Sequence, residues 1–174
     1  MLARPIDDGQ VDLWYVHSDR DVDSELLAAY RRLLSDDETE QAARFAVEEP
    51  RRQFLVARAL LRTVLSYYTN DDPRAWVFEH NAYGKPAVAG PARLPLEFNL
   101  SHTRGLIACG VTPAGELGVD VEALDRSPDH LQLARRYFAP LETEALEALP
   151  HDQQHAAFFQ FWTLKEAFVQ ARGQ

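Results

Sequence analysis

The hydrophobic pattern of this chain changes its period several times and never settles into a regular alternation of strand and helix. Residues 50–69 carry apolar side chains at helical spacing and predict a long amphipathic helix. Residues 76–80, 106–111 and 117–121 are β-like, and 112–116 is predicted as the hairpin loop joining the last two. Helices mixed with hairpin-linked strands in this way favour an α+β fold over a doubly wound parallel sheet.

Caps, prolines and β-forming runs predict the remaining elements. Ser35 followed by Glu38 has the form of a capping box that opens a helix. The further strands and helices are expected at 11–16, 24–34, 35–45, 98–102, 128–137, 140–149 and 152–171. Gly173 is the expected stop of the last helix. The Gly- and Pro-containing stretch 90–95 is the predicted connection between an N-terminal half, 1–95, and a C-terminal half, 96–174.

Composition excludes several classes of protein. With 174 residues, 46% of them apolar, the chain is long enough for one packed domain or two small fused halves. Its 27 acidic and 18 basic side chains give a net charge of −9, which argues against general nucleic-acid binding. No apolar run approaches the ~20 residues of a membrane span. The single cysteine, Cys109, excludes an internal disulfide framework and indicates a reducing, cytoplasmic location.

Two carboxylates lie close together in the segment Gly118–Glu122. On a strand, Val119 and Val121 would face the core, and Asp120 and Glu122 would share the opposite face. Adjacent carboxylates repel each other unless a cation lies between them, and oxygen ligands of this kind suit Mg²⁺. The same alternation also occurs on a solvated strand face, so both interpretations stay open here.

A second candidate is the pair Lys165–Glu166 in the last predicted helix. Phe161, Trp162 and Phe168 lie at three- and four-residue spacings from the lysine, so bulky rings flank the pair. Partial desolvation there would strengthen the action of its charges. An amphipathic helix whose Lys and Glu merely border the core gives the same pattern.

Two further motifs suit phosphate. Ser101 and His102 stand near the end of a predicted strand, where a hydroxyl and an imidazole could donate to phosphate oxygens. Gly84–Lys85–Pro86 forms a turn that carries a cation. Lys85 and Lys165 are the only two lysines of the sequence, and each lies within one of these motifs.

The order of the four motifs is more informative than any one of them. Together they resemble the Sfp-type 4′-phosphopantetheinyl transferases, in YGKP at 83–86, FNLSHT at 98–103, GVDVE at 118–122 and WTLKEA at 162–167. The segments 34–45 and 54–62 are also similar to that family, so the resemblance spans essentially the whole chain.

The resemblance implies a pseudo-twofold pair of α+β halves with the active site between them. It also implies Mg²⁺-dependent transfer of the phosphopantetheine arm of coenzyme A to a serine of an acyl or peptidyl carrier protein. Asp120, Glu122 and Glu166 match the Mg²⁺-binding acids. Glu166 also matches the proposed general base, and Lys165 matches a contact to the coenzyme A phosphates.

Further coenzyme contacts are implied for Lys85, Ser101 and His102. The region that matches a basic cluster of the family is acidic here, at Asp36–Gln41. The nucleotide contacts are therefore expected from nearby arginines, namely Arg44, Arg51, Arg52 or Arg58.

Two other departures leave alternatives open. Gln170 stands where many relatives carry a lysine, and the sequence stops at Gln174 where relatives continue, so we expect an incomplete C-terminal half. A relative that binds coenzyme A or a carrier protein without efficient transfer is one alternative, and a metal-dependent phosphohydrolase is another. Because carrier proteins are usually acidic, a local basic patch at 135–136 or 51–52 is the expected docking contact.

Overall fold

The computed structural model describes residues 3–82, 84–89, 96–113, 115–125 and 129–173. Its elements, in chain order, are β1 (Asp12–His17), α1 (Ser24–Arg31), α2 (Asp36–Ala43), α3 (Glu48–Thr69), the 3-10 turn η1 (Pro73–Ala75), β2 (Phe78–His80), β3 (Pro86–Val88), β4 (Glu97–Thr103), β5 (Leu106–Thr112), α4 (His130–Tyr137), α5 (Pro140–Glu147) and α6 (His151–Ala171). The mixture of helices and small antiparallel sheets confirms the predicted α+β class. The pseudo-twofold relation between halves stays a prediction.

The largest sheet is antiparallel and has the strand order β1-β5-β4. β4 and β5 are joined by the short turn Arg104–Gly105, where Gly105 has φ 78°. A backbone in this left-handed region favours glycine because it has no Cβ. β1 pairs with the other edge of β5, although β5 lies almost a hundred residues later in the sequence. Residues on both sides of the predicted connection therefore build one sheet, and 90–95 itself lies outside the described residues.

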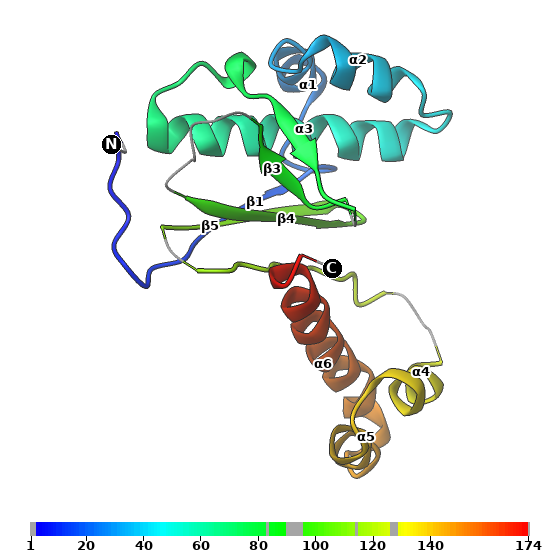
Figure 1. Ribbon diagram of the computed structural model, residues 1–174. Helices are drawn as coiled ribbons and strands as arrows, with labels where there is room; N and C mark the ends of the chain where they lie inside the picture. Colours follow the sequence, from blue (N-terminus) through cyan, green and yellow to red (C-terminus); the bar gives the residue numbers. More distant parts are fainter. Residues whose placement is uncertain (1–2, 83, 90–95, 114, 126–128, 174) are drawn as a thin grey trace.

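α3 covers one face of this sheet (Figure 1). The C-terminal part of the helix, at Leu61, Val64 and Leu65, packs against Phe98 and Val111 of the sheet. Complete burial of one such leucine contributes about 1.5–3 kcal/mol. The helix ends where predicted, because Asn70 adopts a left-handed φ of 64°. Together, β1–β5 and α1–α3 form the sheet lobe.

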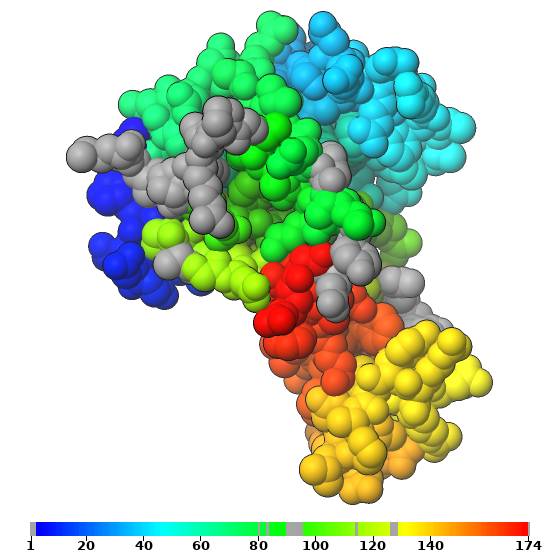
Figure 2. Space-filling model, viewed as in Figure 1, coloured from blue at the N-terminus to red at the C-terminus, as the bar shows by residue number. Residues whose placement is uncertain are grey.

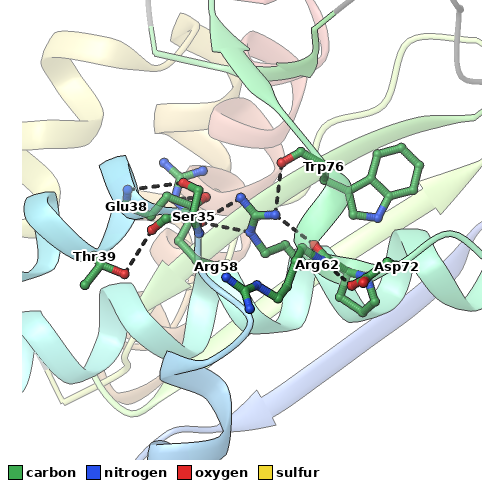
Figure 3. A network of polar contacts seen from close by, with 9 residues as sticks. Ser35, Glu38, Thr39, Arg58, Arg62, Asp72 and Trp76 are labelled. Carbon is green, nitrogen blue, oxygen red and sulfur yellow. Dashed lines mark hydrogen bonds and ion pairs between the residues drawn. The ribbon is translucent and has the colours of Figure 1, made fainter.

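The N-terminal part of α3 holds α1 and α2 in place. Val56 and Ala57 share a core with Leu27 of α1 and Ala42 of α2. Ser35 caps α2 and forms the predicted capping box with Glu38, as Figure 3 shows. Hydrophobic packing and the cap together attach both short helices to α3.

A buried ionic network reinforces this attachment (Figure 3). Arg62 of α3, only 1% exposed, places Nε and Nη2 each 2.8 Å from Glu38 Oε2. Its Nη1 donates to the carbonyls of Pro73 and Trp76, at 2.8 and 3.0 Å. A single guanidinium therefore connects α2, α3 and the chain leading into β2.

α4, α5 and α6 form a separate helical lobe with its own core around Phe138, Leu146 and Phe158. α6 meets the sheet lobe on the side opposite α3 and leads away from it (Figure 1), so the helical lobe projects from the molecule in Figure 2. α6 ends within one residue of its predicted C-terminus, and Gly173 has the expected left-handed φ of 73°. None of the described helices combines the length and apolarity that a membrane crossing requires.

The predicted strand at 117–121 and the predicted hairpin at 112–116 are wrong. Residues 117–123, called the acidic segment below, are extended but lie outside both sheets. The physical reason is that amides of this segment donate to side chains of β4, so no ladder of main-chain hydrogen bonds is formed. Alternation alone could not distinguish these two kinds of partner.

Candidate functional site

The acidic segment is held against β4 by three side chains of that strand. Asn99, Ser101 and Thr103 lie at every second position and therefore share one face of the strand. Each accepts one backbone N–H bond, in the pairs Val119 N to Asn99 Oδ1 at 2.7 Å, Val121 N to Ser101 Oγ at 3.2 Å and Ala123 N to Thr103 Oγ1 at 3.1 Å. This arrangement, the side-chain ladder, fixes the register of the segment that carries Asp120 and Glu122.

The other side of the acidic segment lies directly on α6. A Cβ at Gly118 would overlap Ala167 O and approach Ala171 N to 2.6 Å. Glycine is thus the residue that lets the two backbones come together, which gives the glycine of the GVDVE motif a packing role. Two predicted site motifs, far apart in sequence, meet at this contact.

Lys85 stabilises the same junction from the turn between β2 and β3. Its Nζ donates to Leu117 O of the acidic segment and to Gln170 O of α6, each at 3.1 Å. Asn81 Nδ2 donates to Gly173 O at 2.8 Å. Gln170 lies in the last turn of α6, where the helix dipole favours a cation, and Gly173 follows the helix. Lys85 therefore braces the acidic segment against α6.

Asp120 uses its two carboxylate oxygens differently. Oδ1 accepts from Ser101 Oγ at 2.9 Å and from Gln170 Nε2 at 3.5 Å. Oδ2 is buried and has no hydrogen-bond partner. Burial raises the pKa of Asp120, the Ser101 hydrogen bond lowers it, and the charge of Glu122 raises it further. A buried carboxylate oxygen without a donor is suited to a cation.

Glu166 of α6 lies within electrostatic reach of this pair. Burial, followed by the charges of Asp120 and Glu122, raises the pKa of Glu166. The fold thus gathers the three predicted acids into one electrostatic neighbourhood. Across the described parts of the chain, no three His, Cys, Asp or Glu side chains stand arranged as a metal site. The donor set still fits an oxygen-preferring dication, because such an ion would relieve the mutual repulsion and give Asp120 Oδ2 a partner.

Lys165 points toward α5. Its Nζ lies 2.7 Å from Glu142 Oε2 and 5.3 Å from the centre of the Phe138 ring. The Lys165 hydrogen bond lowers the pKa of Glu142. Lys165 and Glu166 both line a hollow of about 800 Å³ between α4, α5 and α6, whose walls are largely aromatic.

The residues of the Ser–His pair lie in different environments. Ser101 is only 6% exposed, and its hydroxyl contacts Asp120 and Val121. His102 is the next residue along β4, so its ring extends toward the opposite face of the strand. Partial burial and the neighbouring charge of Arg58 lower the pKa of His102.

Two of the predicted coenzyme-binding arginines, Arg44 and Arg52, have other partners in the sheet lobe. Arg44 is exposed and pairs with Glu40 at 2.9 Å. Arg52 donates from Nε to Ser18 O at 2.7 Å and from Nη2 to Val22 O, and thereby fixes the chain between β1 and α1. It also lines a second cleft, of about 340 Å³. Their roles in coenzyme binding stay predictions.

Sequence analysis gave no role to several residues that build the site. Asn99 and Thr103 support the acidic segment, and Gln170 contacts Asp120. The sequence held one indication of the ladder, because the polar residues Asn99, Ser101 and Thr103 stand at every second position of a strand. The structure buries Asn99, which is 3% exposed. No local pattern indicated the partner of Gln170.

Comparison with known proteins gives a consistent result. The model of the 4′-phosphopantetheinyl transferase superfamily matches residues 116–174, and the model of a 4′-phosphopantetheinyl transferase N-terminal region matches 20–112. The chain is 39% identical over 167 residues to the 4′-phosphopantetheinyl transferase HetI of Nostoc sp., covering 94% of this chain and 69% of HetI.

Two relatives from Bacillus subtilis are also similar. One, named 4′-phosphopantetheinyl transferase, is 32% identical over 81% of this chain and 61% of its own length. The other, the 4′-phosphopantetheinyl transferase Sfp, is 27% identical over 93% of this chain and 70% of its own length. The chain therefore spans between 61% and 70% of the length of these three relatives.

Proposed function

Because the chain belongs to the 4′-phosphopantetheinyl transferase superfamily, we propose that it transfers the 4′-phosphopantetheine arm of coenzyme A to a serine of an acyl or peptidyl carrier protein, with Mg²⁺. The observation that carries the proposal is the contact at Gly118, which brings the acidic segment with Asp120 and Glu122 onto the helix that carries Glu166. A reducing, cytoplasmic location belongs to the same proposal and is consistent with the buried, free Cys109.

Asp120, Glu122 and Glu166 are the residues that would hold Mg²⁺. When bound, the ion supplies positive charge beside the pyrophosphate of coenzyme A, which favours breaking the phosphoanhydride bond. The raised pKa values of Asp120 and Glu166 fit this role. Carboxylates that repel each other in the free protein gain most from a shared cation.

Glu166 is the proposed general base. Its carboxylate takes the proton of the carrier serine hydroxyl as the serine Oγ bonds to the phosphorus on the pantetheine side of the pyrophosphate. The bond from that phosphorus to the bridging oxygen breaks, and adenosine 3′,5′-bisphosphate leaves with the bridging oxygen. A general base in this position typically contributes about 10²–10⁴ in rate. Because a bound Mg²⁺ would lower the pKa of Glu166, a metal-bound water that relays the proton is the alternative route.

Cations for the coenzyme phosphates are proposed at Lys165, Arg44 and Arg52. His102 is proposed as a neutral hydrogen-bond donor, because its pKa is lowered. Lys165 would exchange Glu142 for a phosphate oxygen, since both are anionic partners at the edge of the same hollow. Lys85 would contribute the charge of its ammonium from its braced position.

Intact-mass analysis of an apo carrier protein with coenzyme A and Mg²⁺ tests the proposal. The wild type should add one phosphopantetheine to the carrier, whereas Asp120→Asn and Glu166→Gln should abolish the mass change. Glu144→Gln, at an exposed acid of α5 outside the cluster, is the matched control and should behave as wild type. An unchanged carrier mass at high wild-type concentration would refute transfer.

One observation favours a second function, binding without efficient transfer. Gln170 places a neutral amide 3.5 Å from Asp120, at the position where many relatives of this type carry a lysine. Calorimetry that finds coenzyme A binding together with an unmodified carrier would establish this alternative. If calorimetry finds no coenzyme A binding and mass analysis finds no modified carrier, both functions are eliminated.

A further inference from the structure

The side-chain ladder has three bonds of similar kind, but one of its members makes an additional contact. Asn99, Ser101 and Thr103 each accept an amide of the acidic segment. Ser101 also donates to a site carboxylate, since its Oγ lies 2.9 Å from Asp120 Oδ1. We propose that Ser101 is a positioning residue that orients Asp120 for the metal ion. The inference rests on the proposed function and deepens it.

The hydrogen-bond capacity of a hydroxyl supports this assignment. Serine has one O–H donor and two acceptor lone pairs. Because the Asp120 carboxylate accepts and the Val121 amide donates, the single proton of Ser101 goes to Asp120 and one lone pair goes to Val121. No proton remains for a phosphate oxygen. The burial of Ser101, at 6% exposure, also keeps the hydroxyl away from a ligand in solution.

The effect on Asp120 is asymmetric. Ser101 and Gln170 both donate to Oδ1, while Oδ2 is buried without a hydrogen-bond partner. A carboxylate held by one oxygen cannot rotate freely, so its second oxygen keeps one direction. Groups that orient metal-binding residues in this way typically change metal affinity by about 10–100-fold when they are removed.

The ladder also connects the two parts of the site. Ser101 belongs to the sheet lobe, and the acidic segment that it holds lies on α6 through Gly118. The Ser101 hydroxyl therefore fixes both the distance between the acidic segment and β4 and the rotation of the Asp120 side chain. Thr103 accepts the corresponding hydrogen bond from the amide of Ala123, the residue after Glu122. Thr103 is therefore the natural control.

The test measures Mn²⁺ binding to the full chain by electron paramagnetic resonance, with coenzyme A binding in metal-free buffer measured by calorimetry. Ser101→Ala should bind Mn²⁺ about tenfold more weakly than wild type, with unchanged affinity for coenzyme A. Ser101→Thr keeps the hydroxyl and should restore the Mn²⁺ affinity. Thr103→Val removes one ladder bond but no contact to Asp120, so its loss of Mn²⁺ affinity should be clearly smaller than that of Ser101→Ala.

Three results would overturn the inference while leaving the proposed function in place. Ser101→Ala with wild-type Mn²⁺ affinity and weaker coenzyme A binding would make Ser101 a phosphate contact. Thr103→Val with the same Mn²⁺ loss as Ser101→Ala would assign the effect to the ladder as a whole.

If Ser101→Ala does not fold, Ser101→Cys is used in its place, because a thiol is a weak donor of similar size. Wild-type Mn²⁺ affinity in Ser101→Cys would overturn the inference. Absence of Mn²⁺ binding in the wild type would instead refute the metal-dependent function and this inference together.

Discussion

The sheet lobe and the helical lobe are stabilised in different ways. In the sheet lobe, α3 takes part in two cores, and the buried ion pair between Arg62 and Glu38 connects them to η1 and β2. The described helical lobe has one smaller core, whereas large apolar side chains are exposed on both lobes, such as Leu164 and Tyr15. The sheet lobe therefore holds its side of the site with more buried packing than the helical lobe.

The site lies where the lobes meet. Asp120 is positioned by the sheet lobe through the ladder, whereas Glu166 is carried by α6. The contacts of Gly118 and Lys85 hold α6 to the acidic segment. Stability and activity should consequently respond to different substitutions, and the following experiments test that separation.

The largest loss of stability is expected from Glu38→Ala in the sheet lobe. The substitution leaves Arg62, 1% exposed, without its anionic partner, and breaking one side of a buried pair costs about 3–5 kcal/mol. Urea unfolding measures the change. Glu40→Ala, which removes an exposed pair with Arg44, should change the free energy of unfolding by less than about 1 kcal/mol. Equal losses in both variants would mean that the network does not stabilise this lobe.

At the junction, Gly118→Ala should affect activity more than stability. The new Cβ would collide with the backbone of Ala167 and Ala171, and overpacking of this kind costs about 1–3 kcal/mol. Displacing Asp120 relative to Glu166 by about an ångström should lower kcat/KM for carrier modification about a hundredfold.

Gly110→Ala is the matched comparison for that variant. The Cβ at this position would meet the side-chain atom Val119 Cγ2 at 2.6 Å, and a side chain can rotate where a backbone cannot. Its effect on both quantities should be smaller. If Gly110→Ala reduces kcat/KM as strongly as Gly118→Ala, the direct contact between backbones is not what positions the acids.

The sequence was sufficient for features that depend on neighbouring residues. Helical spacing placed α3 and α6, and Ser35 with Glu38 predicted a capping box that the structure contains. The site residues Asp120 and Glu166 were selected by their motifs. Their proximity could not be derived from local pattern, because it depends on a packing contact at Gly118.

The errors have a common physical origin. Residues 117–121 alternate as a strand does, yet their amides donate to side chains 20 residues earlier. The phosphate contact of Lys85 stays a prediction, but nothing in the sequence indicated that its Nζ also contacts two carbonyl oxygens. Every residue has a main-chain carbonyl, so the sequence does not indicate which carbonyl a side chain will contact. Partners of this kind can be identified only in the structure.

Lys85→Met and Lys165→Met compare the two lysines directly. Lys85→Met removes two hydrogen bonds of the junction, to Leu117 O and Gln170 O, and should reduce the free energy of unfolding by about 1–3 kcal/mol. Lys165→Met removes a pair with Glu142 in which each side chain is about one third exposed, so the loss should stay below about 1 kcal/mol. Urea unfolding without ligand gives both values. If Lys85→Met leaves the free energy of unfolding unchanged, Lys85 does not stabilise the junction.

The smallest effect concerns pH. Burial is the main cause that raises the pKa of both Asp120 and Glu166, so the folded protein binds more protons at these groups than the unfolded chain. Their contribution to stability is complete below their ordinary pKa of about 4 and is lost as pH rises through the higher folded values. In chelator-treated buffer at pH 7, Glu166→Gln should therefore be more stable than wild type, by less than about 1 kcal/mol because water screens the partly exposed group. The difference should disappear at acidic pH, and Glu144→Gln should show none at either pH. If Glu166→Gln is less stable than wild type at neutral pH, the ionised Glu166 is stabilised in the fold. That result would contradict the burial and charge repulsion described for this site.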